Sequence, residues 1–139
     1  MSQNPIPQGK YKPAVRHGGL IFTAGMTPRK NGVLLMSGKI TPDRPLDDYR
    51  EAVIQAASNA LTAAQNTLKE GERIVQLLSL TVYLNASPDY TPHAKVGDIA
   101  SNWLYEQLGE AGIGPRAAIG VATLPGNAPV EIQLVAAVG

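Results

Sequence analysis

The pattern of apolar and polar positions divides the chain into short strands and two helices. Apolar or alternating runs predict strands at residues 15–16, 20–24, 33–35, 74–84, 117–124 and 130–138. The pair Asn31-Gly32 predicts a tight turn before the third of these strands, because both positions tolerate a positive φ. The run at 74–84 is apolar on both faces for part of its length, which is typical of a central, covered strand.

The first helix is predicted at residues 46–68. Asp43 or Asp47 can act as its N-cap, and Gly71 is expected to end it. Its apolar stripe, at helical spacing, consists of Val53, Ala56, Ala57, Ala60, Leu61, Ala64 and Leu68. The many alanines predict close packing of this helix against a sheet.

The second helix is expected to open at Thr91-Pro92, in the order of cap and first position, and to stop at Gly109. Its apolar face consists of Val96, Ile99, Ala100, Trp103, Leu104 and Leu108. A helix between successive strands predicts βαβ crossovers, and both helices then lie on one face of the sheet, because such crossovers are right-handed.

The opposite face of the sheet is expected to be bare. We expect it to carry apolar side chains, namely alternate members of 74–84 together with Ile132, Leu134 and Ala136. An uncovered apolar face of this size indicates an interface, so the sequence predicts a homo-oligomer with these sheets at its centre. We find no linker or internal repeat and interpret residues 1–139 as a single domain.

Composition narrows the function classes. The chain is 44% hydrophobic and 17% charged, with a net charge of +1 and no cysteine. The absence of cysteine excludes disulfides, thiolate metal sites and a cysteine nucleophile. Aromatic residues make up 5%, and no basic stripe accompanies them, so we do not expect a nucleic-acid binder. Without a signal-peptide pattern or an apolar run long enough for a membrane span, we expect a cytoplasmic enzyme or binding protein.

Familiar catalytic sets are absent. His17 is placed in a turn and His93 in the first turn of a helix, so both are expected at the surface rather than as metal ligands. No nucleophile elbow accompanies them. The glycine cluster at 109–114 follows a helix and has the wrong order for a dinucleotide-binding loop.

Arg116 and Glu131 are the two candidates for chemistry. Arg116 opens an apolar strand, where a planar guanidinium can bind a carboxylate through two hydrogen bonds, and the small residue Ala118 leaves room for a ligand. The alternative is an edge arginine in water or in a structural ion pair. Glu131 lies between apolar neighbours and can hold a water or relay a proton, or it can be an outward-facing strand position.

The C-terminal segment 114–132, with the sequence GPRAAIGVATLPGNAPVEI, resembles the signature of the RidA/YjgF/L-PSP family. That signature has an arginine at a strand start, a Leu-Pro turn and a Val-Glu-Ile strand. The segment YKPAV at 11–15 resembles the family's Tyr-x-x-Ala-Val, and LIFTAG at 20–25 resembles its strand leading to Ser-Gly-Gln. TVYL at 81–84, followed by a helix, fits the middle of the family pattern. The likeness covers nearly the whole chain.

The resemblance implies an α+β, chorismate-mutase-like fold: a mixed β-sheet with two helices packed on one face. It implies a homotrimer with the sheets facing the centre and pockets between subunits. Enzymes of this family hydrolyse reactive enamines and imines, such as 2-aminoacrylate, to keto acids and ammonia without a cofactor or metal. Arg116 matches the family arginine that binds the substrate carboxylate. Glu131 matches the family glutamate that is linked to a water, and Tyr11 matches a tyrosine that lines the pocket.

Gly25 and Ala118 are predicted to line the same pocket. If the last two strands were direct neighbours, Arg116 and Glu131 would lie on the order of 15 Å apart at ~3.3 Å per residue. They can share a pocket only if the strands are not neighbours or if two chains contribute.

Some positions depart from the family pattern. Met26 follows Ala24-Gly25 where the family often has Ser-Gly-Gln, and Ala118 replaces a cysteine or threonine. The helix asparagine of many deaminases falls near Ser101 or Asn102. The region 85–100 is longer than in the well-known deaminases, and these departures indicate a divergent branch.

Three functions remain open at this point. The first is an imine or enamine deaminase, and the second is a non-catalytic small-carboxylate-binding or regulatory protein that uses the same arginine. The third is RNA cleavage or translation inhibition, a label often attached to the family. The charge and aromatic content argue against this third function.

Overall fold

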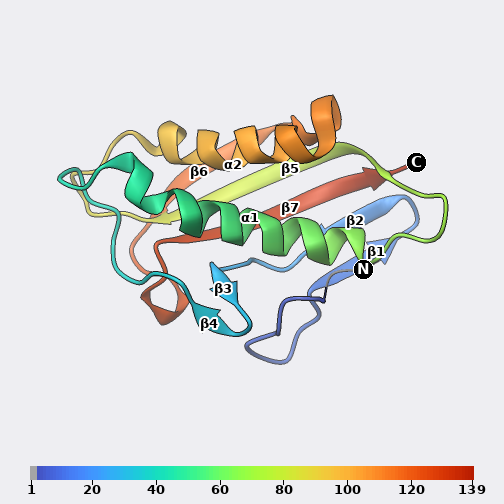
Figure 1. Cartoon of the computed structure of the whole chain (residues 1–139), viewed down its shortest axis with the longest axis horizontal. Helices are drawn as coiled ribbons and strands as arrows, with labels where there is room; N and C mark the ends of the chain where they lie inside the picture. Colours follow the sequence, from blue (N-terminus) through green and yellow to red (C-terminus); the bar gives the residue numbers. More distant parts are fainter. Residues whose placement is uncertain (1–2) are drawn as a thin grey trace.

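A computed structural model of the chain describes residues 3–139 and has one five-stranded mixed sheet at its centre (Figure 1). The strands of this sheet are β1 (Ala14–His17), β2 (Leu20–Thr23), β5 (Ile74–Asn85), β6 (Arg116–Val121) and β7 (Val130–Val138). Their order across the sheet is β1-β2-β7-β5-β6. Strand β6 runs parallel to β5, and the other neighbouring pairs are antiparallel.

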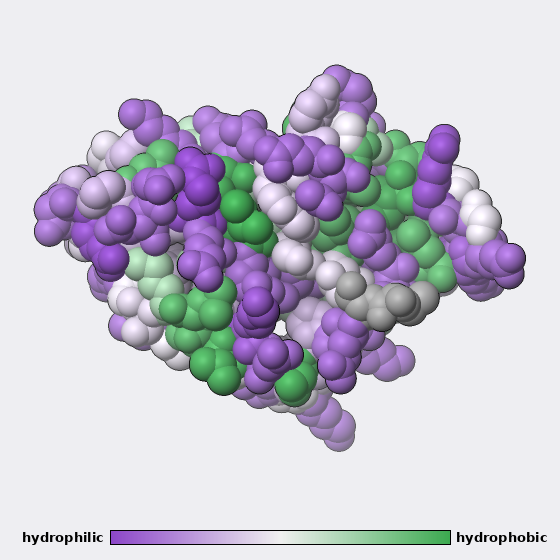
Figure 2. Space-filling view, in the orientation of Figure 1, coloured by the Kyte–Doolittle hydropathy of each residue, from purple (hydrophilic) through white to green (hydrophobic). Residues whose placement is uncertain are grey.

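The two helices cover one face of this sheet, as the crossover rule predicts (Figure 1). Helix α1 (Arg50–Gln65) connects the early strands to β5, and α2 (His93–Leu108) connects β5 to its parallel neighbour β6. The α+β architecture expected from the sequence is therefore confirmed. Figure 2 shows this helix-covered side, where hydrophilic residues predominate at the surface.

A small hairpin stands beside the main sheet. Strands β3 (Arg29–Lys30) and β4 (Val33–Leu34) pair around the predicted turn. Asn31 and Gly32 have φ values of 55° and 81°, so the turn uses the left-handed region that these two residue types tolerate.

The boundaries of the helices correct three predictions. Helix α1 ends at Gln65 with Asn66 as its C-cap, so it neither continues to residue 68 nor is ended by Gly71. No side chain caps α1: a 3₁₀ turn at Leu46–Tyr49 precedes it, and Asp47 pairs instead with Arg50. Pro92 occupies the cap position of α2 and no side-chain cap is formed there, so Thr91 does not serve as the cap either. The end of α2 at Gly109 is confirmed, and its φ of 66° is one that glycine adopts without strain.

The helices and sheet enclose the core between them. The predicted stripe is buried from Val53 to Ala64, which allows α1 to approach the sheet closely, whereas Leu68 lies beyond the end of the helix and is only partly buried. Large side chains with under 2% exposure include Ile21, Leu77, Leu84, Leu104, Ile132 and Leu134.

The identity of the residues on the bare face corrects another prediction. Ile132, Leu134 and Ala136 lie under the helices, with exposures of 0%, 1% and 0%. The alternate set on β7, which includes Glu131 and Gln133, faces the uncovered side. Side chains do alternate between the two faces along β7, but the more apolar of the two rows belongs to the helix-covered core.

The uncovered face still exposes a row of large apolar side chains. Those with exposures of 39–49% are Val15, Leu20, Phe22, Leu78 and Ile119. Leu78 reaches this face because the register of β5 against β7 shifts between Leu77 and Ser79. The homo-oligomer remains a prediction, and these residues are the surface on which it depends. None of the helices in residues 3–139 is long and apolar enough to cross a bilayer.

Candidate functional site

Arg116 is the first residue of β6, an edge strand, and its side chain turns toward α2. It lies level with the buried residue Leu80 of β5, which places it on the helix-covered face. Its Nη1 donates hydrogen bonds to Asp98 Oδ1 at 2.9 Å and to Ser101 Oγ at 3.0 Å. Its Nη2 donates to the Ala94 carbonyl at 3.5 Å. The guanidinium is therefore held by about two turns of α2, from Ala94 to Ser101.

A glycine makes this approach possible. A Cβ built on Gly97 would lie 3.0 Å from Arg116 Cζ, so a larger residue there would press on the guanidinium. The Arg116 side chain keeps 22% of its surface exposed, and the Asp98 side chain keeps 60%. The site is thus an ordered arginine that remains open on one side.

The residues that follow Arg116 on the same side of β6 are small. Ala118 and Gly120 continue the row toward α2, because alternate strand residues share a face. His93, at the start of α2, covers Gly120, and a Cβ on Gly120 would lie 2.7 Å from His93 Nε2. The other ring nitrogen, Nδ1, lies 3.0 Å from the Thr91 carbonyl oxygen, the geometry of a hydrogen bond that Nδ1–H donates.

The sequence reasoning placed His93 at the surface, whereas the structure places it half-buried in the row that contains Arg116. It also left the choice between Ser101 and Asn102 open. Ser101 contacts Arg116, while Asn102 is exposed. The predicted site does not include Asp98, although its position three residues before Ser101 on the same helix indicates that both can face Arg116.

Glu131 lies elsewhere, on the uncovered face of the sheet. It is level with Tyr83 of β5, three residues along that strand from the partner of Arg116. Because three is an odd number of strand residues, the two side chains point to opposite faces. Strand β5 separates their strands, so within one chain they are about 14 Å apart at ~4.8 Å per strand and ~3.3 Å per residue.

The surroundings of Glu131 are unusual for a carboxylate. No described residue donates a hydrogen bond to it, and desolvation by burial raises the pKa of Glu131 above its ordinary value. A Cβ on Gly25 would lie 2.3 Å from Glu131 Oε2, so the absence of a side chain at Gly25 makes room for the carboxylate.

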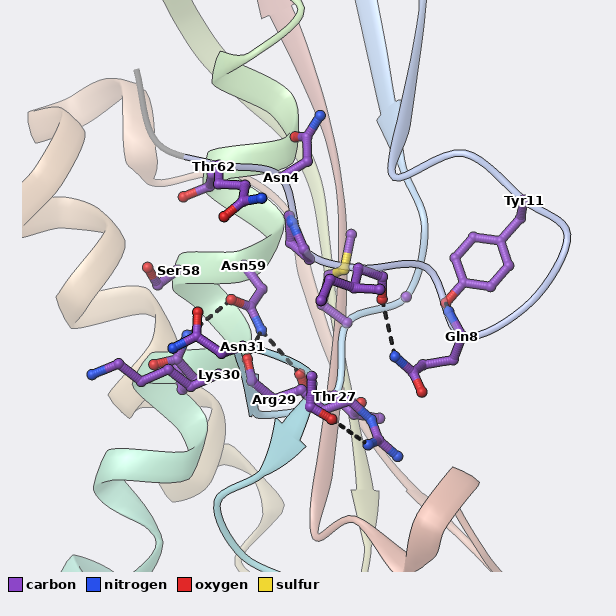
Figure 3. Close-up of a pocket in the computed structure, with 17 residues that line it drawn as sticks. Asn4, Gln8, Tyr11, Thr27, Arg29, Lys30, Asn31, Ser58, Asn59 and Thr62 are labelled. Atoms are coloured by element: carbon purple, nitrogen blue, oxygen red, sulfur yellow. Dashed lines mark hydrogen bonds between the residues drawn. The ribbon is translucent and has the colours of Figure 1, made fainter.

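Gly25 also lines a cavity of about 240 Å³ between the N-terminal segment, α1 and the β3–β4 hairpin (Figure 3). Tyr11 belongs to this cavity, and its hydroxyl accepts a hydrogen bond from the Gln8 backbone N–H at 3.0 Å. Amide and hydroxyl side chains form much of the remaining lining, including Asn4, Asn31, Gln55, Ser58, Asn59 and Thr62. Figure 3 shows several of them converging from α1 and the hairpin.

Met26 is mainly a buried packing residue. Its side chain is 6% exposed, and its backbone exchanges two hydrogen bonds with Ile132. It therefore contributes to the cavity wall and to the core, and it anchors the segment that carries Gly25 to β7.

The predicted site residues thus form two groups within one chain. Arg116 and Ala118 lie together at the β6 edge beneath α2. Tyr11 and Gly25 line the cavity at the other side of the molecule, with Glu131 next to Gly25. Among residues 3–139, no three His, Cys, Asp or Glu side chains come close enough to hold a metal ion.

Comparisons with known proteins agree with this fold. A putative endoribonuclease from Shewanella oneidensis MR-1 has a similar solved structure, with a TM-score of 0.87 and 28% identity over 98% of this chain and 90% of that one. Protein TCP17 of Trypanosoma cruzi is 28% identical over 91% of this chain and 80% of its own length. A RutC family protein of Aquifex aeolicus is 28% identical over 95% of this chain and 91% of its own.

A family model described as Endoribonuclease L-PSP matches residues 1–138. This match spans nearly all of the chain and agrees with the C-terminal motif that contains Arg116 and Glu131. The chain therefore belongs to the Endoribonuclease L-PSP family, also known as the RidA/YjgF/L-PSP family.

Proposed function

We propose that the chain hydrolyses reactive enamines and imines of small carboxylic acids, such as 2-aminoacrylate and imino acids, to keto acids and ammonia. The observation that carries the proposal is how Arg116 is held and how far it is exposed. Its guanidinium is fixed by Asp98 and Ser101 yet partly open to solvent, beside a row of small residues on an edge strand. A fixed guanidinium with adjacent space suits a small carboxylate.

The reaction needs little beyond orientation and a water. Arg116 holds the carboxylate, so that the imine carbon has a defined position. Burial raises the pKa of Glu131, which suits a group that holds a water or passes a proton. The proposed reaction requires neither a covalent nucleophile nor a cofactor or metal.

The proposal also requires two chains at each site. Arg116 and Glu131 lie on opposite faces of one sheet, so one molecule does not bring them together. The proposal therefore needs a homotrimer in which the uncovered faces meet at the centre and the β6 edge of one chain approaches the Glu131 side of its neighbour. The exposed apolar row on that face supports such an assembly.

The test is hydrolysis of imines generated in situ by an amino-acid oxidase or a dehydratase. We expect wild type to accelerate loss of the imine, and Arg116→Ala to lower kcat/KM at least about 100-fold, because orientation is lost. Measurement of the oligomeric state of both proteins by light scattering shows that the variant is folded and assembled.

The outcomes separate the alternatives. Carboxylate binding that needs Arg116, without acceleration across a panel of imines, would replace the deaminase with a non-catalytic binder. RNA cleavage that survives extensive purification and falls steeply with salt would favour the activity after which several relatives are named.

A further inference from the structure

The ion pair between Arg116 and Asp98 changes what the site can bind. The two side chains meet at 2.9 Å, so the positive charge of the guanidinium is already balanced in the free protein. A ligand that brings only a carboxylate approaches Arg116 and, at the same time, the like charge of Asp98. A lone arginine would attract such an anion more strongly than this pair does.

Asp98 is the more solvent-exposed member of this ion pair. The Asp98 side chain is 60% exposed, compared with 22% for Arg116. Within the described residues, the hydrogen bond that its carboxylate accepts from another side chain comes from Arg116 alone. Asp98 therefore has free acceptor capacity, because an ionised carboxylate can accept several hydrogen bonds.

A second acceptor lies on the same helix. The Ala94 carbonyl, one turn before Asp98, is 3.5 Å from Arg116 Nη2. The guanidinium is thus bordered by a carboxylate, a carbonyl and the Ser101 hydroxyl, all from α2. Surroundings that are rich in acceptors suit a ligand that brings N–H donors as well as a carboxylate.

We propose that Asp98 makes this site select ligands with a protonated nitrogen one carbon away from the carboxylate, such as α-amino acids and α-iminium acids, over keto acids of the same size. The inference rests on the proposed function, in that Arg116 must bind the ligand carboxylate. The adjacent opposite charges of such a ligand match the adjacent opposite charges of Arg116 and Asp98. Selection of this kind is a difference between two affinities.

The selection has a consequence for the reaction. Proton uptake by the imine nitrogen gives an iminium, and Asp98 favours this cationic form over the neutral one. The water oxygen then forms a bond to the iminium carbon, while the π electrons of the C=N bond move to nitrogen and the water loses a proton. In the resulting carbinolamine the hydroxyl proton passes to nitrogen, and the C–N bond breaks as the C=O bond forms, which gives ammonia and the keto acid. The product lacks the nitrogen, so Asp98 disfavours it and promotes its release.

The test compares L-alanine with pyruvate, which share a three-carbon skeleton and a carboxylate and differ in nitrogen or oxygen at the second carbon. Binding to the assembled wild-type protein is measured by calorimetry or by NMR titration. We expect L-alanine to bind about tenfold more tightly than pyruvate, and Asp98→Asn to bring the two affinities close together.

Glu106→Gln is the matched control. It lies on the same helix, is exposed and removes the same charge. We expect it to preserve the preference for L-alanine. Equal affinities in wild type, or a preference unchanged by Asp98→Asn, would overturn the role of Asp98.

Arg116→Ala distinguishes the failure of the Asp98 inference from the failure of the proposed carboxylate site. Loss of both ligands in Arg116→Ala, with a preference that Asp98→Asn does not alter, overturns only the selection for nitrogen. Binding of both ligands that Arg116→Ala leaves unchanged overturns the carboxylate site, and with it the inference.

Discussion

The two groups of candidate residues differ in how their charges are held. At the β6 edge, Arg116 is fixed by Asp98 and Ser101, and its charge is balanced. On the uncovered face, Glu131 receives no hydrogen bond from any described residue, and burial raises its pKa. Arg116 therefore already has ordered hydrogen-bond partners within one chain, whereas the Glu131 carboxylate has none among the described residues.

This difference indicates that the surroundings of Glu131 are the part of the site that one chain leaves incomplete. Arg116 already donates hydrogen bonds to Asp98 and Ser101. The half-buried carboxylate of Glu131 accepts none from the described residues, so it can still accept hydrogen bonds from a neighbouring chain, a water or a ligand. We infer that the second chain and the bound ligand complete the surroundings of Glu131.

The largest expected effect comes from changing the shape of the ordered cation while keeping its charge. We expect Arg116→Lys to lower kcat/KM for imine hydrolysis by about 100-fold, because the ammonium lacks the planar fork that grips a carboxylate. Lys95→Arg, an exposed change on α2, should leave kcat/KM unaltered. Full activity of Arg116→Lys would show that only the charge matters, contrary to the fixed geometry.

A matched pair of glycine substitutions gives the next effect. We expect Gly97→Ala to raise KM about tenfold, since its Cβ would lie 3.0 Å from Arg116 Cζ and would shift the carboxylate grip. We expect Gly25→Ala to lower kcat about tenfold, since its Cβ would lie 2.3 Å from Glu131 Oε2 and would displace the group that holds the water. Steady-state kinetics separates the two.

The control for this pair is stability. Alanine is favoured over glycine in a helix by about 1 kcal/mol, so Gly97→Ala should unfold no more easily than wild type. If Gly97→Ala and Gly25→Ala changed KM and kcat alike, the division of labour between the two groups would be wrong.

The smallest effect concerns stability against pH. The pKa of Glu131 is raised in the folded chain, so the folded state holds its proton to a higher pH than the unfolded state does. The free energy of unfolding should therefore fall as pH rises from the unfolded pKa, about 4.5, through the raised folded pKa. Glu131→Gln should remove this decline, and denaturant unfolding across pH 4–8 measures it. An identical decline in both proteins would show that Glu131 is not its source.

Glu72 provides an internal contrast for the same experiment. Its hydrogen bonds from Arg16 and from the Lys69 backbone hold the pKa of Glu72 at about 2. A lowered pKa gives stability that is present above the unfolded value and is lost as pH falls toward the folded one. The Glu72 contribution therefore falls in acid, opposite in direction to that of Glu131.

The local elements could be predicted from the sequence, because they depend on nearby residues. The Asn31-Gly32 turn, the alanine stripe of α1 and the stop at Gly109 each follow from conformational preference or helical spacing. The helix starts were predicted less well. Asp43, Asp47 and Thr91 are good caps by residue type, but the chain enters each helix through proline-containing segments that leave them outside the cap position.

The arrangement of the strands could not be predicted from spacing alone. Alternation divides β7 into two rows, but it does not say which row the helices cover, and Ile132 and Leu134 proved to lie beneath them. The insertion of β5 between β6 and β7 is a long-range pairing that no local pattern encodes. For the same reason, the contact between Arg116 and Asp98 became visible only with the helix placed over the strand.

The central claim is that each site takes Arg116 from one chain and Glu131 from another. The most direct measurement mixes Arg116→Ala with Glu131→Gln, each nearly inactive alone, after unfolding and joint refolding, and follows imine hydrolysis. If subunits mix at random, about a quarter of the sites should recover both residues, and activity should return to a similar fraction of wild type. Activity that stays at the level of the separate variants, in oligomers shown by mass spectrometry to be mixed, would contradict the shared site.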